Sequence, residues 1–250
     1  MRYFISIVFC LLSVTLFGQL NDADAFFNGS YDKSYTLEHK IKQVKVTNYI
    51  DSNETSYFLF DFDNNGLLKK QTILDKTMKK VSDFTFIYNK HNDLIERINV
   101  DYELNNTDTV IFNKTYDATL IIQETSSELP FLTKHIYNDS KRKIQSIAFL
   151  SKDTTISSKR VFLYSYDTNG KLKGIQETYI ETNNATPASI GMTEFIYDES
   201  GRISEVMRSG KPNYTLSYDM DGFLKSKTVK MTADLGGLTI VEKYSYISWK

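Results

Sequence analysis

The chain has 250 residues and a net charge of −1, with 30 Lys and Arg against 31 Asp and Glu. Such a balance gives no electrostatic footprint for a nucleic-acid backbone or an anionic membrane surface, so we expect no nucleic-acid partner. The single cysteine, Cys10, excludes an internal disulfide. A chain of this length can bury enough apolar surface to fold without such crosslinks.

Residues 1–18 are typical of a secretory signal peptide. Arg2 supplies the positive start, residues 5–16 form a short apolar run, and Gly18 offers a small residue for cleavage. The run is shorter than the roughly 20 apolar residues of a transmembrane helix, so we expect neither an anchor nor any other spanning helix. Cleavage would remove Cys10, which excludes cysteine-bound metal and thiolate catalysis in the mature chain. We expect a secreted, periplasmic or cell-surface protein.

Residues 19–40 show no repeat and are interpreted as a lead-in. After them one motif recurs: an aromatic residue and an Asp, then two residues and a Gly. The complete copies place Asp and Gly at Asp63 and Gly66, Asp167 and Gly170, Asp198 and Gly201, and Asp219 and Gly222. The aromatic anchors of the complete and weaker copies are Phe62, Tyr88, Tyr116, Tyr137, Tyr166, Tyr197 and Tyr218. Their spacing leaves room for two strands and two turns in each copy.

The residues around each motif predict a β-hairpin. Aromatics alternate before the turn, as in Phe58, Phe60 and Phe62, which places them on one face of a strand. Asp at the first turn position and Gly at the fourth favour a type I turn closed by a left-handed residue. An aliphatic residue two positions after the Gly, such as Leu68, marks the returning strand.

These signals predict an all-β fold of about 14 to 16 antiparallel strands joined as successive hairpins. Residues 41–250 form a single repeat domain, and no convincing helix pattern is present. Because the aromatic face must be covered, we expect the sheet to roll up into an open barrel or a flattened sandwich. The sequence does not decide whether the sheet closes.

The segments 164–172 and 195–203 resemble the RHS/YD-repeat family. Its repeat has aromatics around Tyr-Asp, two free positions, then Gly, a basic residue and an aliphatic, as in Tyr166 to Leu172. The resemblance covers roughly residues 57 to 247 and implies β-hairpin repeats in an extracytoplasmic bacterial setting. In long members of the family such repeats form a spiralling shell. The resemblance implies no activity.

Two motifs raise the question of a metal site. Asp61 to Gly66 resembles the start of a calcium loop, but Thr72 stands where the bidentate Glu belongs, so a hairpin turn is the simpler interpretation. His39, His91 and His135 have no regular ligand spacing. We therefore expect no metal and no cofactor.

The sequence offers no nucleophile elbow, phosphate loop or metalloprotease motif, so we expect no enzyme and name no catalytic residue. Aromatic stripes could stack on sugars, although core packing is the simpler role. The leading hypothesis is a non-catalytic binding or scaffold module whose partner is a glycan, a cell-wall component or an envelope protein. The alternatives are a loop-based hydrolase and an outer-membrane β-barrel, which the charged alternate faces disfavour.

Overall fold

The computed structural model describes residues 33–116, 121–126, 132–140, 142–152, 155–181, 184–231 and 237–249. The expected signal peptide, residues 1–18, lies outside the described residues. The same holds for residues 19–32 of the expected lead-in and for the turn that follows Tyr116.

The described residues form sixteen antiparallel strands in a single sheet, with neighbours in sequence paired in space. The strands are β1 (Ile41–Ile50), β2 (Asn53–Phe62), β3 (Leu68–Asp75), β4 (Lys80–Tyr88), β5 (Leu94–Asp101), β6 (Asn106–Tyr116), β7 (Ile121–Ser126), β8 (Leu132–Tyr137), β9 (Lys143–Lys152), β10 (Thr155–Tyr166), β11 (Leu172–Glu181), β12 (Asn184–Tyr197), β13 (Ile203–Arg208), β14 (Lys211–Tyr218), β15 (Leu224–Lys230) and β16 (Thr239–Ser248). The predicted all-β fold of successive hairpins is confirmed.

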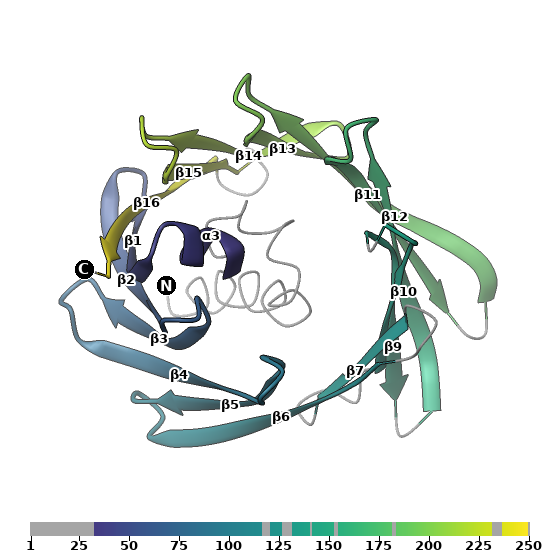
Figure 1. The fold of residues 1–250 in the computed structure, drawn as a ribbon, viewed down its shortest axis with the longest axis horizontal. Helices are drawn as coiled ribbons and strands as arrows, with labels where there is room; N and C mark the ends of the chain where they lie inside the picture. Colours follow the sequence, from purple (N-terminus) through teal and green to yellow (C-terminus); the bar gives the residue numbers. More distant parts are fainter. Residues whose placement is uncertain are drawn as a thin grey trace.

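The first and last strands also pair, which joins the two edges of the sheet. β1 pairs with β16 from Ile41↔Ser248 to Ile50↔Ile240 and with β2 on its other side. The result is a closed barrel, seen as a ring of strands in Figure 1. The predicted rolled antiparallel sheet is confirmed, and the sequence left its closure undecided because no local motif records the pairing of the two chain ends.

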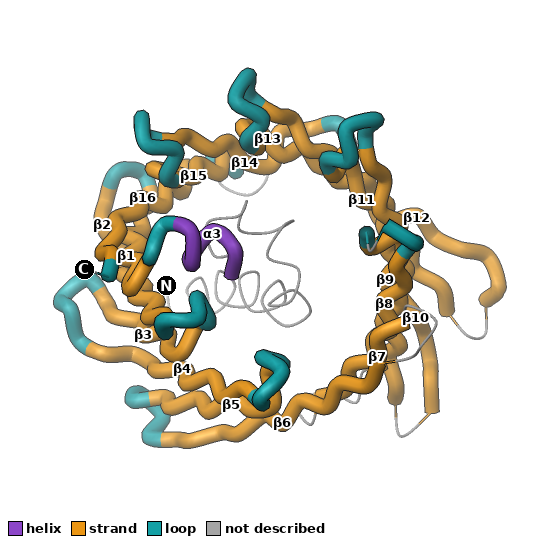
Figure 2. Tube along the Cα trace, in the orientation of Figure 1, coloured by secondary structure: helices purple, strands orange, loops and turns teal. Residues whose placement is uncertain are grey.

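A short helix, α3 (Lys33–Glu38), precedes the first strand and lies inside the ring of strands (Figures 1 and 2). Thr36 Oγ1 donates a hydrogen bond to Gly66 O at 2.9 Å, which ties the helix to the β2–β3 turn. The sequence predicts no helix here, since six residues are too few to show a helical period. No helix among the described residues is long and apolar enough to span a bilayer.

Ring contacts beside α3 identify which face of the sheet points inward. The His39 ring packs against Phe223 with centroids 5.0 Å apart, and Phe223 packs against Tyr246 at 4.9 Å. Tyr246 pairs with Val44, whose other partner is Phe60. We call the face that carries Val44, Phe60 and Tyr246 the inner face, and register extends it around the whole barrel because alternate residues share a side.

The inner face carries the apolar core. One cluster of buried residues comprises Ile41, Val44, Val46, Phe60 and Phe62. A second comprises Phe195, Ile203, Val206, Tyr214, Leu216 and Leu224. The alternating aromatics therefore contribute mainly to core packing, where cross-strand rings bury large areas.

The outer face is mixed in character. It carries charged residues on most strands, namely Lys45, Asp61, Lys70, Asp83, Glu96, Lys134, Lys159, Glu194, Glu205 and Lys243. Exposed aliphatic side chains such as Leu163, Met192 and Ile247 lie between them. This alternation of charges and single apolar residues is usual for a sheet face in contact with water.

Candidate functional site

The four complete motifs fold into the same turn. In the first, Gly66 N donates to Asp63 O at 3.0 Å, and the Asp63 Oδ1 atom accepts bonds from Asn65 N and Leu67 N. Gly66 adopts a φ of 71°, where a residue with a Cβ would be strained. The glycines of the other complete copies, Gly170, Gly201 and Gly222, have φ values of 84°, 79° and 87°.

The Tyr hydroxyl of the motif bonds to the preceding hairpin. Five hydroxyls donate to a backbone carbonyl: Tyr88 to Leu68 at 2.9 Å, Tyr166 to Lys143 at 2.7 Å, Tyr197 to Leu172 at 2.7 Å, Tyr218 to Ile203 at 2.8 Å and Tyr246 to Leu224 at 2.8 Å. We call these bonds the tyrosine staples. In the third of them the β11–β12 ladder ends at Gly174↔Glu194, so Leu172 has no partner residue in β12, although it pairs with Tyr166 of β10. The Tyr197 hydroxyl satisfies the Leu172 carbonyl, which would otherwise lose a hydrogen bond.

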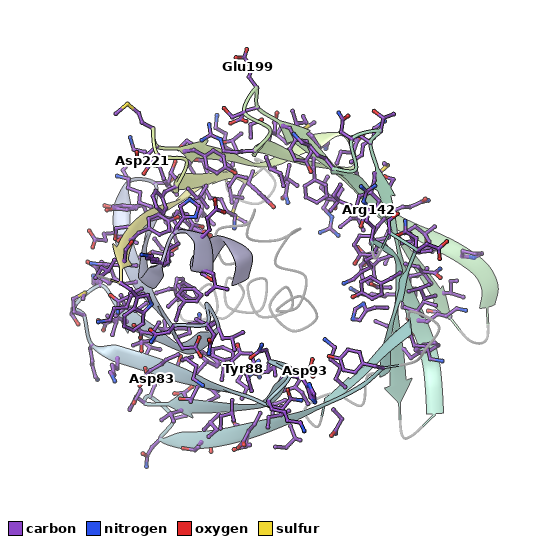
Figure 3. The ribbon with its side chains drawn as sticks, viewed as in Figure 1. Asp83, Tyr88, Asp93, Arg142, Glu199 and Asp221 are labelled. Carbon is purple, nitrogen blue, oxygen red and sulfur yellow. The ribbon has the colours of Figure 1, made fainter. Side chains whose placement is uncertain are left out.

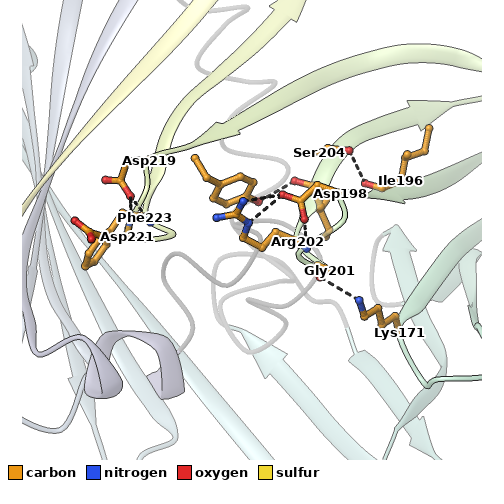
Figure 4. Close-up of polar contacts among 11 residues, drawn as sticks. Lys171, Ile196, Asp198, Gly201, Arg202, Ser204, Asp219, Asp221 and Phe223 are labelled. Atoms are coloured by element: carbon orange, nitrogen blue, oxygen red, sulfur yellow. Dashed lines mark hydrogen bonds and ion pairs between the residues drawn. The ribbon is translucent and has the colours of Figure 1, made fainter.

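A basic side chain from the previous hairpin covers four of the five stapling rings, and Phe223 packs against the fifth, Tyr246. Lys171 Nζ lies 5.1 Å from the Tyr197 ring centroid, and Arg202 lies 4.6 Å from that of Tyr218. Figure 4 shows Arg202 paired with the Asp198 carboxylate and Lys171 bonded to the Gly201 carbonyl. These cation–π contacts and the staples link each hairpin to the next one at the turn end.

The remaining anchors are placed differently. Phe62 lacks a hydroxyl and lies in the core. Tyr116 donates its hydroxyl to Asp93, which also receives Lys114 Nζ at 3.7 Å. Tyr137 lies beside Lys143, whose Nζ is 5.8 Å from the ring centroid. The anchors thus position the wall of the barrel.

Replacing Tyr197 with Phe is expected to lower the free energy of unfolding by about 1 kcal/mol, because the Leu172 carbonyl loses its hydrogen bond. Tyr179→Phe is the matched control, since the Tyr179 hydroxyl makes no hydrogen bond with the described residues. Urea unfolding followed by circular dichroism measures both variants. Equal effects of the two substitutions would contradict a role for the staple.

Two arginines share one carboxylate on the inner face. Arg160 Nη1 lies 3.5 Å from Glu177 Oε1, and Arg208 Nη2 lies 3.3 Å from Glu177 Oε2. Their strands, β10, β11 and β13, bring them together from distant parts of the sequence. The Glu177 side chain is 14% exposed, whereas those of Arg160 and Arg208 are 45% and 55% exposed. The carboxylate therefore lies deep, and the two guanidinium groups lie above it.

A second polar group on the inner face is almost completely buried. His135 Nδ1 lies 2.8 Å from Ser146 Oγ, which donates to the Tyr164 hydroxyl at 3.2 Å. Lys143 is 7% exposed and places Nζ 5.7 Å from the Tyr164 ring centroid. Burial lowers the pKa of the Lys143 amine to about 7. Ser146 and His135 are buried as well, so neither presents a reactive atom to solvent.

Asp83, labelled in Figure 3, has four side-chain partners on the outer face. Its carboxylate accepts hydrogen bonds from the Thr72 hydroxyl at 2.6 Å and the Tyr102 hydroxyl at 2.8 Å. Lys70 and Lys80 each place Nζ 3.0 Å from Oδ2. Burial alone would raise the pKa of Asp83, but these four donors outweigh burial and hold the pKa well below its usual value.

The metal motifs of the sequence do not converge. The described residues contain no group of three or more His, Cys, Asp or Glu side chains arranged to hold a metal ion. Asp63 directs Oδ1 to turn amides, while Asp61 accepts a bond from Gln43 on the outer face. His39 packs on Phe223, His91 lies in a turn and His135 contacts Ser146. The calcium-like segment is thus a hairpin turn.

Comparison with solved structures finds proteins of similar fold. The chain is similar in fold to a porin-like protein from Bacteroides uniformis. The two share 10% sequence identity with a TM-score of 0.50, over 84% of this chain and 97% of the other. A weaker likeness, with 12% identity and a TM-score of 0.30, covers 72% of this chain and 12% of a chain in the Tc holotoxin pore of Photorhabdus luminescens.

No protein-family model matches the sequence, and no curated protein is significantly similar to it. The relation to the RHS/YD repeats therefore stays a resemblance of motif. The likeness to the porin-like protein concerns the barrel alone.

Sequence reasoning missed two accessible charged groups of the inner face, Arg160 and Arg208. Each occupies an alternating position in a strand, where a charged residue ordinarily indicates the solvent side. The signal that could have found them is their place in the alternation of side chains along each strand. Arg160 stands two residues before Phe162, on the same face as the aromatic anchors.

Proposed function

We propose that this protein is a non-catalytic binding or scaffold module that acts outside the cytoplasm, with the inner face of the barrel as its binding surface. The observation that carries the proposal is that the accessible guanidinium groups of Arg160 and Arg208 lie on that face beside the half-buried ring of Tyr179. Rings stack on apolar ligand surfaces, and guanidinium groups bind anions, so both parts of an amphipathic ligand find a partner. Candidate ligands are glycans, cell-wall components and envelope proteins.

Two observations weigh against the other functions. Hydrolysis needs a nucleophile that a substrate can reach, and the Ser146–His135 pair is buried. A membrane barrel needs an apolar outer band, because a charged side chain facing lipid costs about 2 to 4 kcal/mol at mid-bilayer. The outer face here carries Lys45, Lys134 and Lys243 within strands, which supports a barrel surrounded by water.

A binding screen of the purified protein tests the proposal. The protein is immobilised and exposed to arrayed glycans, peptidoglycan fragments and solubilised cell-envelope extract. We expect saturable retention of at least one class. If a protein with native circular dichroism retains nothing from any of the three, the binding role is wrong.

A further inference from the structure

The ion triad of Arg160, Glu177 and Arg208 carries more positive charge than its own pairing uses. Two guanidinium groups meet one carboxylate, which leaves the triad with an excess of one positive charge. Each arginine uses a single N–H in the triad, although a guanidinium has five. The remaining donors of both side chains have no hydrogen-bond partner among the described residues.

The two arginines are also accessible and held in place. About half of each side chain is exposed, while the Glu177 carboxylate beneath them is mostly buried and anchors both. Gly191, paired with Glu177 on the neighbouring strand, leaves room for the Ser209 hydroxyl next to Arg208. A Cβ at that position would lie 2.8 Å from Ser209 Oγ and 4.0 Å from Arg208 Nε. Anchoring reduces the entropy that each arginine would lose when it binds a ligand.

A ring lies next to this pair of cations. Tyr179 is the cross-strand partner of Arg160 and therefore shares the inner face with it. Its side chain is half-buried and makes no polar contact with the described residues. A planar guanidinium matches the two oxygens of a carboxylate, and an aromatic ring matches the apolar face of a sugar.

We propose that Arg160, Arg208 and Tyr179 form a binding site for carbohydrates that carry carboxylates, such as chains of uronic acids. The carboxylate of the ligand takes the free guanidinium donors, and its ring stacks on Tyr179. The proposal rests on the proposed function, because it names the ligand class of the same inner face. Acidic peptides also carry carboxylates, but they lack the ring face that Tyr179 would contact.

The test measures binding of trigalacturonate to the purified protein by isothermal titration calorimetry at low salt. We expect binding that falls about ten-fold or more in Arg160→Gln and in Arg208→Gln, as the loss of a charged hydrogen-bonded pair predicts. Arg202→Gln is the matched control, since it removes the same charge from a turn. The methyl ester of trigalacturonate has the same rings without free carboxylates and should bind at least ten-fold more weakly.

Each other outcome is informative. If trigalacturonate binds equally to wild type and both variants, the site lies elsewhere and this inference is wrong, while the binding function stands. If the protein binds only neutral glycans or envelope extract, the ligand class is wrong. If triglutamate binds as tightly as trigalacturonate, the carbohydrate part is wrong. If nothing binds, the proposed function fails together with the site.

Discussion

Val44→Asp is expected to open the barrel at the junction of β1 and β16. Val44 is 0% exposed and lies between Phe60 of β2 and Tyr246 of β16. An aspartate there would bury a charge among rings without a partner, which we expect to cost about 4 kcal/mol. All other neighbouring strands of the described sheet are consecutive in sequence, whereas β1 and β16 are held together by non-covalent contacts alone. Urea unfolding and hydrogen exchange over residues 41–50 and 239–248 measure the effect.

Thr47→Asp is the control for that substitution. Thr47 lies on the same strand but on the outer face, where its cross-strand partners are Tyr57 and Lys243. A carboxylate next to Lys243 should change the free energy of unfolding by no more than about 0.5 kcal/mol. If Val44→Asp prevents folding altogether, Val44→Ala is the milder variant. It creates a cavity that should lower the free energy of unfolding by about 2 kcal/mol. If hydrogen exchange in residues 41–50 and 239–248 is no faster in Val44→Ala than in wild type, the prediction that the barrel opens at this junction is wrong.

The hairpin unit could be predicted because its chemistry is local. An Asp that accepts turn amides and a Gly with positive φ lie within four residues of each other, as Asp167 and Gly170 show. The returning aliphatic Leu172 follows at a fixed offset and pairs with Tyr166 across a bulge. Such contacts join residues that are close in the sequence, so the sequence alone predicts them.

The contacts between hairpins could not be predicted in the same way. The Tyr197 hydroxyl bonds to a carbonyl 25 residues earlier, and the motif contains no information about that partner. The closure of β1 on β16 depends on how many hairpins complete one turn of the barrel, which is a global property of strand number and tilt. The Arg160–Glu177–Arg208 triad depends on register across β10 to β13.

The short helix α3 is another feature that could not be predicted from the sequence. It contacts Gly66 through Thr36 and precedes the His39–Phe223 ring pair, so tertiary packing rather than helix propensity holds it. Residues 33–38 therefore read as part of a lead-in when the sequence is taken alone. The barrel explains their helical form, because the inner face offers a surface on which one turn of helix can pack.

Asp83→Ala is expected to lower the free energy of unfolding by about 3 kcal/mol at pH 7, because it leaves Lys70, Lys80 and the Thr72 hydroxyl around an empty position. The pKa of Asp83 is lower in the folded state than its ordinary value of 3.8. Its contribution is therefore fully present above pH 3.8 and is lost as the pH falls through the lower folded value. The difference in the free energy of unfolding between wild type and Asp83→Ala, measured by urea unfolding, should become smaller below about pH 4.

Asp61→Ala is the matched control on the same outer face. Asp61 accepts a single side-chain bond, from Gln43 at 2.7 Å, and its removal should cost about 1 kcal/mol or less. Thr72, Lys80 and Tyr102, which contact Asp83, come from β3, β4 and the β5–β6 turn. A larger loss of unfolding free energy in Asp83→Ala than in Asp61→Ala would show that the Asp83 cluster holds these three segments together. Equal losses for both, or a gap at Asp83 that stays constant from pH 7 to pH 3, would show that the carboxylate acts only as an ordinary surface charge.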